Sequence, residues 1–176
     1  MQLKNSITQF GLVAIFFHWI MAILIIALLA LGLYMVRLPL SLEKLKLYGW
    51  HKEYGMLVLM LVTLRSIWRV SSIVPALSLP AWERWTARTV HYIFYVLMFA
   101  MPLTGWLMTS FSGFPVSFFG WFIFPDLVSP HADLIIFFKK THKWLGYGLI
   151  AIIVLHTGAA LKHHFIDKDD ILRRML

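Results

Sequence analysis

Long stretches without charged residues alternate with short polar segments along this chain. Asp, Glu, Lys and Arg are absent from Asn5 to Val36 and from Thr89 to Pro125, and each stretch exceeds the roughly 20 residues that a membrane-spanning helix needs. Two shorter apolar stretches, Tyr54 to Leu64 and Trp144 to Leu161, are bordered by charged residues, among them lysines and arginines whose long side chains reach the lipid headgroups. The pattern predicts four transmembrane helices, at residues 11–36, 51–70, 88–110 and 141–163.

Composition supports the same interpretation. Hydrophobic residues make up 60% of the 176 residues and charged residues 14%, and the mean hydropathy is +0.77, which is more apolar surface than a soluble domain of this size could cover. The first apolar stretch is too long for a cleaved signal peptide, so we expect it to stay in the membrane. We therefore expect an all-α membrane protein with one domain over residues 1–176, folded as a four-helix bundle.

The segment at residues 111–125, FSGFPVSFFGWFIFP, is dense in aromatic residues, glycine and proline. This composition predicts a break in regular structure and an apolar cap on the bundle at headgroup depth. An even number of spans places both termini on one side of the membrane. That side would carry nine of the sixteen lysines and arginines, so we expect both termini in the cytoplasm.

Histidine is the residue type left to carry chemistry inside the membrane. The chain has no cysteine, which excludes disulfides, a cysteine-ligated iron–sulfur cluster and a covalently attached haem. The apolar stretches contain no Asp or Glu, so the carboxylate relay of a proton pump is not expected. A buried imidazole in lipid needs a partner, and it is treated first as a functional residue.

His142 and His156 lie on the same face of one predicted helix. They are 14 residues apart, and 14 steps of about 100° end about 40° short of four full turns. At about 1.5 Å per residue they are separated by roughly 21 Å along the helix, which is enough for two stacked haems. His18 matches the depth of His156, and His51 matches the depth of His142 because each would open its helix on the outer side. We expect these two pairs to bind two haem groups.

A small residue follows each of these four histidines by one helical turn. A haem macrocycle lying against a helix needs a flat surface beside its ligand, and the residue one turn on shares the face of the histidine. A fifth histidine, His91, is followed at this offset by Tyr95, so we assign it instead to a hydrogen bond with a haem propionate or a quinone. The small residues are Ala22, Gly55, Gly146 and Ala160.

Three other interpretations of the histidines stay open. A single histidine in a membrane is commonly a hydrogen-bond partner between helices. A transition-metal ion also binds imidazole, but it would need three or four ligands at one depth. A haem-free structural membrane protein is the third, and an absorption spectrum distinguishes it.

Several charged or titratable residues lie near the predicted ends of the helices. His163 and His164, where the last helix leaves the bilayer, belong either to a solvated basic helix end or to a quinone pocket. Arg65 and Arg69 are expected to anchor to headgroups or to meet a haem propionate. Three lysines beside His142, which would steer a small anion towards the outer haem, are Lys139, Lys140 and Lys143.

Particular motifs resemble those of the bacterial di-haem cytochrome b561 family. They are FFHW around His18, His51 opening the second helix, the spacing of His142 and His156 within KWLGYGLIAIIVLH, and the closing ALKHHFIDKDDILRRM. The resemblance covers essentially the whole chain. It implies a bundle with two b haems, one held by His18 with His156 and one by His51 with His142. It also implies a bacterial inner-membrane location and electron exchange with ubiquinone.

Some members of that family oxidise superoxide at the periplasmic face. We therefore expect transmembrane electron transfer from superoxide through the outer and inner haems to ubiquinone. The alternative is a relay subunit that passes electrons between quinol and a periplasmic redox protein. Membrane lipids and a quinone are the other expected partners, and no nucleic-acid partner is expected.

Overall fold

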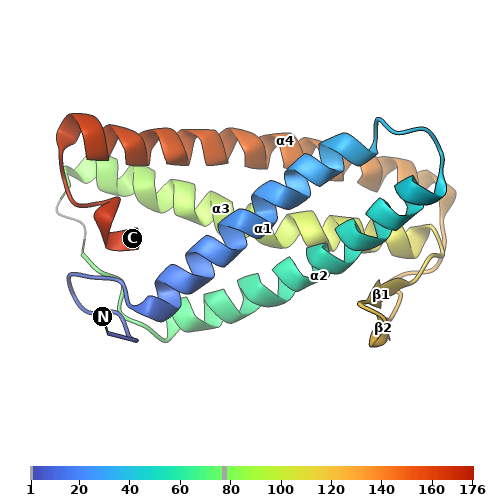
Figure 1. Ribbon diagram of the computed structural model, residues 1–176, viewed down its shortest axis with the longest axis horizontal. Coiled ribbons are helices and arrows are strands. Elements are labelled where there is room, and N and C mark those ends of the chain that lie inside the picture. The colour runs from blue at the N-terminus through green and yellow to red at the C-terminus, as the bar shows by residue number, and fades with distance from the viewer. Residues whose placement is uncertain (1, 77–78) are drawn as a thin grey trace.

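Four long helices form the protein in the computed structural model, which describes residues 2–76 and 79–176. The helices run alternately up and down, so both termini lie at the same end of the bundle (Figure 1). This placement agrees with the expectation from an even number of spans. The helices are α1 (Leu12–Met35), α2 (Leu42–Val70), α3 (Ala81–Phe111) and α4 (Ala132–Lys162).

Three of the helices in the described part of the chain are long and apolar enough to cross a membrane: α1, α3, and α4 with its continuation to Asp167. The second helix, α2, is less apolar because Lys52 and Glu53 interrupt it near one end and Arg65 and Arg69 near the other. Its 29 residues still extend about 43 Å, and it packs against both α1 and α3. The predicted four-helix bundle is therefore confirmed.

Three of the helices begin earlier than the sequence pattern predicts. The second helix starts at Leu42 rather than 51, where the Ser41 hydroxyl accepts a hydrogen bond from the Lys44 backbone N–H. The third starts at Ala81 rather than 88, and the fourth at Ala132 rather than 141. Hydropathy marks only the part of a helix that lies in lipid, and these extra turns are more polar. The prediction that His51 and His142 open their helices is therefore wrong, because both lie inside them.

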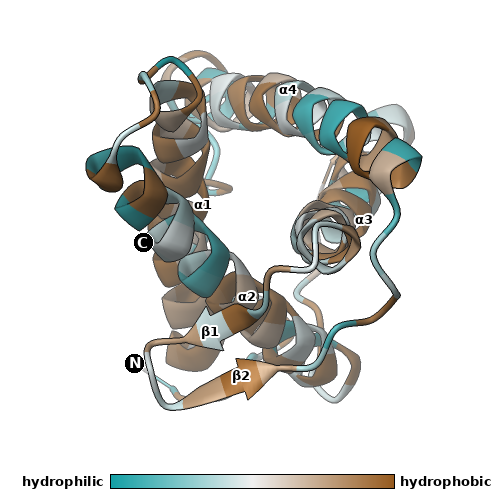
Figure 2. Ribbon diagram, turned by 90° about the vertical axis from the view of Figure 1, so that its right-hand side faces the viewer, coloured by the Kyte–Doolittle hydropathy of each residue, from teal (hydrophilic) through white to brown (hydrophobic). Residues whose placement is uncertain are grey.

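An antiparallel hairpin follows α3. Its strands are β1 (Val116–Phe118) and β2 (Phe122–Phe124), with Val116 opposite Phe124. Its turn includes Gly120, whose φ of +76° suits glycine. Val116 and Phe118 are buried against Met56 of α2, so the hairpin lies over one end of the bundle (Figure 2). The expected cap is present, but the expectation that this segment lacks regular structure is wrong.

The helices surround a common axis in the order α1, α2, α3, α4 (Figure 2). The closely packed neighbours are α1 with α2, α2 with α3, and α3 with α4. The apolar core joins the first three helices through Met21, Val62 and Met98. Large apolar side chains such as Phe16 and Leu155 are more than 60% exposed, as expected of a surface that faces lipid.

Candidate functional site

One histidine pair consists of His51 on α2 and His142 on α4, and we call it the outer pair because it lies towards the end of the bundle away from the termini (Figure 1). The centres of their rings are 6.2 Å apart, and the ring planes are inclined by 76°. Both side chains are half-buried, and the backbone around each is continuous helix. The structure thus brings together, from two helices, the two residues that the sequence analysis paired.

The inner pair consists of His18 on α1 and His156 on α4. Their ring centres are 6.3 Å apart, and the planes are inclined by 59°. On the other side of His156 lie His91 and Phe94 from α3, with ring centres at 5.8 Å and 5.2 Å. The two pairs share α4 and are separated along it by 14 residues, so they lie at different depths of the bundle.

The ring separations fit a metal held between each pair. An imidazole nitrogen binds a transition metal at about 2.0 Å, and the ring centre lies about 1.1 Å behind it, so two rings on opposite sides of one ion have centres about 6.2 Å apart. The observed 6.2 Å and 6.3 Å match this value. Each pair can therefore supply two imidazole nitrogens to one ion, the number that a b haem with two protein ligands takes and fewer than a structural zinc site requires.

Hydrogen bonding around the outer pair is asymmetric. The Thr104 hydroxyl on α3 lies 3.1 Å from Nδ1 of His142, which leaves Nε2 as the nitrogen available to a metal. Nδ1 of His51 is buried and has no hydrogen-bond partner in the described part of the protein. A buried, unsatisfied ring nitrogen calls for an explanation, and a metal bound to this same nitrogen would supply one.

Two glycines that the sequence analysis did not select touch the outer pair. A Cβ atom at Gly32 of α1 would lie 3.2 Å from Cε1 of His51, and one at Gly105 of α3 would lie 3.3 Å from Cε1 of His142. Both distances are tighter than an ordinary van der Waals contact, so bare backbone lies against each ring edge. Glycine within a helix destabilises it by about 1 kcal/mol relative to alanine. The presence of glycine in two apolar helices was therefore the sequence signal that could have indicated a close contact at these positions.

The glycines one turn after His51 and His142 make no such close contact with a histidine ring. A Cβ atom at Gly146 would meet Met101 and Leu29 at ordinary distances, and one at Gly55 would meet no atom within 4 Å. The packing of the described residues therefore gives no reason for glycine at either position. The suggestion that these two residues, Ala22 and Ala160 leave room for a macrocycle stays a prediction.

The two arginines near the end of α2 lie beside α3. The guanidinium groups of Arg65 and Arg69 are 5.9 Å and 5.7 Å from the centre of the Tyr95 ring, within the range of a cation–π contact. Both side chains are half-buried. This position places two positive charges at the same end of the bundle as the inner pair, while contact with a propionate or a quinone stays a prediction.

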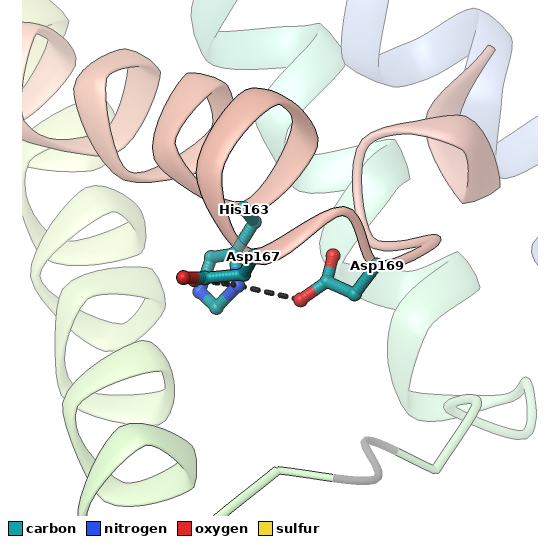
Figure 3. Close-up of side chains that lie close together, drawn as sticks. All are labelled: His163, Asp167 and Asp169. Carbon is teal, nitrogen blue, oxygen red and sulfur yellow. Dashed lines mark hydrogen bonds and ion pairs between the residues drawn. The ribbon is translucent and has the colours of Figure 1, made fainter.

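His163 belongs to a polar cluster after α4, where the backbone continues as a π-helix (His163–Asp167). Its Nδ1 lies 2.6 Å from an oxygen of Asp169 and 3.2 Å from one of Asp167 (Figure 3). The Lys162 ammonium also pairs with Asp167. The ring of His164 packs on Phe165, and its Nδ1 is buried without a hydrogen-bond partner in the described part of the chain. A role of either histidine in quinone binding stays a prediction.

The polar cluster fixes the C-terminal tail. Beyond it, the carbonyl of Met175 accepts a hydrogen bond from the Trp19 indole at 2.6 Å, and Arg174 donates to the carbonyl of Ala76 at 2.8 Å. The Arg174 guanidinium, 2.9 Å from Asp170, holds the pKa of that carboxyl below its usual range. The tail is thereby tied to α1 and to the α2–α3 connection at the end nearer the inner pair.

The three lysines near His142 lie on the outer part of α4. Lys139, Lys140 and Lys143 are exposed, and the Lys143 ammonium lies 5.8 Å from the centre of the Tyr147 ring. They therefore form an accessible basic surface close in sequence to the outer pair. Steering of an anion by this surface stays a prediction.

Known proteins resemble the chain over most of its length. A family model described as prokaryotic cytochrome b561 matches residues 9–176. Cytochrome b561 homolog 2 of Escherichia coli (strain K12) is 37% identical over 186 residues, which cover 100% of this chain and 95% of that protein. Cytochrome b561 homolog 1 of the same organism is 39% identical over 100 residues, or 55% of this chain and 54% of that protein.

A further relative is named probable superoxide oxidase CybB, from Yersinia pestis. It is 34% identical over 95 residues, which cover 51% of each chain. The family model spans almost the whole sequence, and one relative aligns with it end to end. The chain therefore belongs to the prokaryotic cytochrome b561 family, whose members transfer electrons across membranes by means of haem b.

Proposed function

We propose that this chain holds two b haems, one between His51 and His142 and one between His18 and His156, and that it oxidises superoxide and reduces ubiquinone. The observation that carries the proposal is the pair of ring separations, 6.2 Å and 6.3 Å, at two levels of the same helix α4. The partial likeness to a protein named probable superoxide oxidase supports superoxide as the donor. The termini and the polar cluster after α4 are placed on the cytoplasmic side of a bacterial inner membrane.

A b haem held between two imidazoles would supply the transfer of single electrons. The chemistry balances with two superoxide anions for each quinone. Each superoxide loses one electron and leaves as dioxygen, while one ubiquinone takes up two electrons and two protons. The protein binds the cofactors, sets their exposure and separates the two half-reactions by the thickness of the membrane.

The exposed lysines of α4 are suited to the donor side. A small anion approaches a positively charged surface faster than a neutral one, and salt weakens this attraction. Lys139, Lys140 and Lys143 are exposed and lie within three residues of His142 in sequence. We propose that they concentrate superoxide at the outer pair.

Replacing these three lysines with glutamine is expected to slow cytochrome reduction by superoxide about tenfold at low salt, the lower end of reported steering effects. Stopped-flow absorbance with superoxide, at increasing ionic strength, measures this rate. The wild-type rate should fall with salt, whereas the variant rate should change little. A double variant in which Lys4 and Lys168, near the two termini at the other end of the bundle (Figure 1), are replaced with glutamine serves as the control.

An unchanged rate in the triple variant would remove the steering role. If superoxide does not reduce the protein at all, while a periplasmic redox protein purifies with it in equal amounts, the relay function replaces superoxide oxidation. Electron transfer by the haems would survive that result.

The acceptor side is proposed to lie near the inner pair. His91 stands 5.8 Å from His156, measured between ring centres, and Arg65 and Arg69 lie on the neighbouring Tyr95. These groups can donate hydrogen bonds to a quinone carbonyl or to a propionate. We propose that ubiquinone binds among them, with His163 and His164 as further candidates.

Replacing His91 with phenylalanine is expected to slow ubiquinone reduction at least tenfold while leaving reduction by superoxide unchanged, because the phenyl ring keeps the packing but loses the hydrogen bond. Single-turnover absorbance, with superoxide and a short-chain ubiquinone added in separate mixing steps, resolves the two half-reactions. Equal rates in both proteins would exclude His91 from the acceptor site.

A further inference from the structure

The Thr104 hydroxyl has three neighbours in the middle of α3. It lies 2.8 Å from the carbonyl of Ala100, 2.9 Å from the carbonyl of Met101 and 3.1 Å from Nδ1 of His142. A hydroxyl has one hydrogen to donate and two lone pairs to accept with. A carbonyl oxygen can only accept, so the hydrogen of Thr104 points to the backbone, as it commonly does for threonine in a helix.

The histidine nitrogen must then be the donor in the remaining contact. With its hydrogen used on the backbone, the Thr104 oxygen accepts, and Nδ1 of His142 carries a hydrogen. The other nitrogen, Nε2, is left unprotonated and able to bind a metal.

Gly105, next to Thr104 on α3, also contacts the His142 ring. Its position beside Thr104 brings bare backbone to the edge of the imidazole, since a Cβ there would lie 3.3 Å from Cε1 and 3.6 Å from Nδ1. The hydroxyl therefore contacts Nδ1 while the helix backbone limits movement of the ring. By contrast, Nδ1 of His51, across the outer site, has no hydrogen-bond partner among the described residues.

We propose that Thr104 is a positioning residue for His142: its hydroxyl fixes the tautomer and orientation of the ring and thereby lowers the reduction potential of the outer haem. This inference rests on the proposed haem ligation. A ligating histidine that donates its other N–H is a stronger electron donor to the metal, and stronger donation stabilises ferric over ferrous iron. The outer haem thus becomes the better electron donor to its neighbour.

The test compares Thr104→Val, which keeps nearly the same shape, with Thr104→Ser, which keeps the hydroxyl. The valine variant is expected to favour reduction of one haem about tenfold, at the lower end of outer-shell effects. A tenfold change corresponds to about 59 mV for a one-electron couple. The serine variant should titrate like the wild type. A redox titration followed in visible light gives both potentials.

A matched control is Thr109→Val, five residues along the same helix. The Thr109 hydroxyl bonds to the Gly105 carbonyl at 2.9 Å, so this change removes the same kind of hydroxyl without removing the contact to Nδ1 of His142. The affected haem is identified by its absence from a His142→Ala variant. If Thr104→Val loses a haem, Thr104→Ala, which removes bulk as well as the hydroxyl, takes its place.

The outcomes separate the inference from the function it rests on. A shift in the outer haem alone, reversed by serine, supports the role of Thr104. Two haems with unchanged potentials in the valine or alanine variant would overturn that role and leave the haem ligation standing. A wild-type protein without haem would overturn both.

Discussion

Replacing His142 with alanine is expected to lower the haem content of the purified protein from two per chain to one. With His142 gone, His51 alone would not retain the outer haem, whereas the inner pair, with ring centres at 6.3 Å, would be unchanged. Alanine at position 156 should produce the reverse loss. The ratio of haem to protein, from the pyridine haemochrome spectrum and amino-acid analysis, measures this directly.

His131 supplies the matched control for this experiment. It is exposed, precedes the first turn of α4 and makes no side-chain cap hydrogen bond. Alanine at position 131 should therefore leave both haems in place. Retention of two haems after the change at His142 would contradict the assignment of the outer ligands.

Replacing Gly105 with valine is expected to remove the outer haem with nearly the same effect as loss of the ligand. A Cβ atom at this position already lies 3.3 Å from Cε1 of His142, and the added methyl groups extend about 1.5 Å further. The ring must then leave its place beside Thr104 and can no longer face His51. Valine at Gly32, whose Cβ would lie 3.2 Å from Cε1 of His51, should act in the same way from the other side.

A Gly148→Val variant tests whether a β-branched residue at any position in a helix would cause loss of a haem. Gly148 lies on the same helix as His142, and a Cβ atom there would meet no atom within 4 Å. Valine at position 148 carries the same loss of backbone freedom without the clash, so its haem content should remain at two per chain. Equal loss of haem in the Gly105 and Gly148 variants would show that helix disturbance, rather than contact with the ring, is responsible.

The histidine pairs could be anticipated because helix geometry is fixed. A spacing of 14 residues places His142 and His156 on one face wherever the helix begins, so an error of nine residues in its start did not affect their relationship. Matching depth then selected His18 and His51 as partners. In the structure, the ring centres of each pair lie no more than 6.3 Å apart, although the binding of haem by these residues stays a proposal.

The helix ends could not be read from hydropathy. Apolar stretches report contact with lipid, whereas a helix continues as long as its backbone hydrogen bonds are favourable. The start of α2 did carry a different signal, since Ser41 precedes Glu43 in the first turn, a common helix-start pattern. The hairpin was missed for a similar reason, because its aromatic strands look only apolar, yet they flank a glycine-containing turn.

The residues around the histidine rings depend on how neighbouring helices are rotated, and one sequence does not give that rotation. Gly32, Thr104 and Gly105 come from two helices, and each acts on a histidine of another. Because these residues are a threonine and two glycines within apolar stretches, their types suggested a special role. Only the packed bundle shows which ring each one meets.

If each histidine pair holds one b haem, the visible spectrum of the wild-type chain, quantified as haem per polypeptide, must account for both pairs. We expect two haems per chain, both low-spin and six-coordinate, with no binding of carbon monoxide to the reduced protein. A colourless protein, a single haem per chain, or a reduced form that binds carbon monoxide would contradict it.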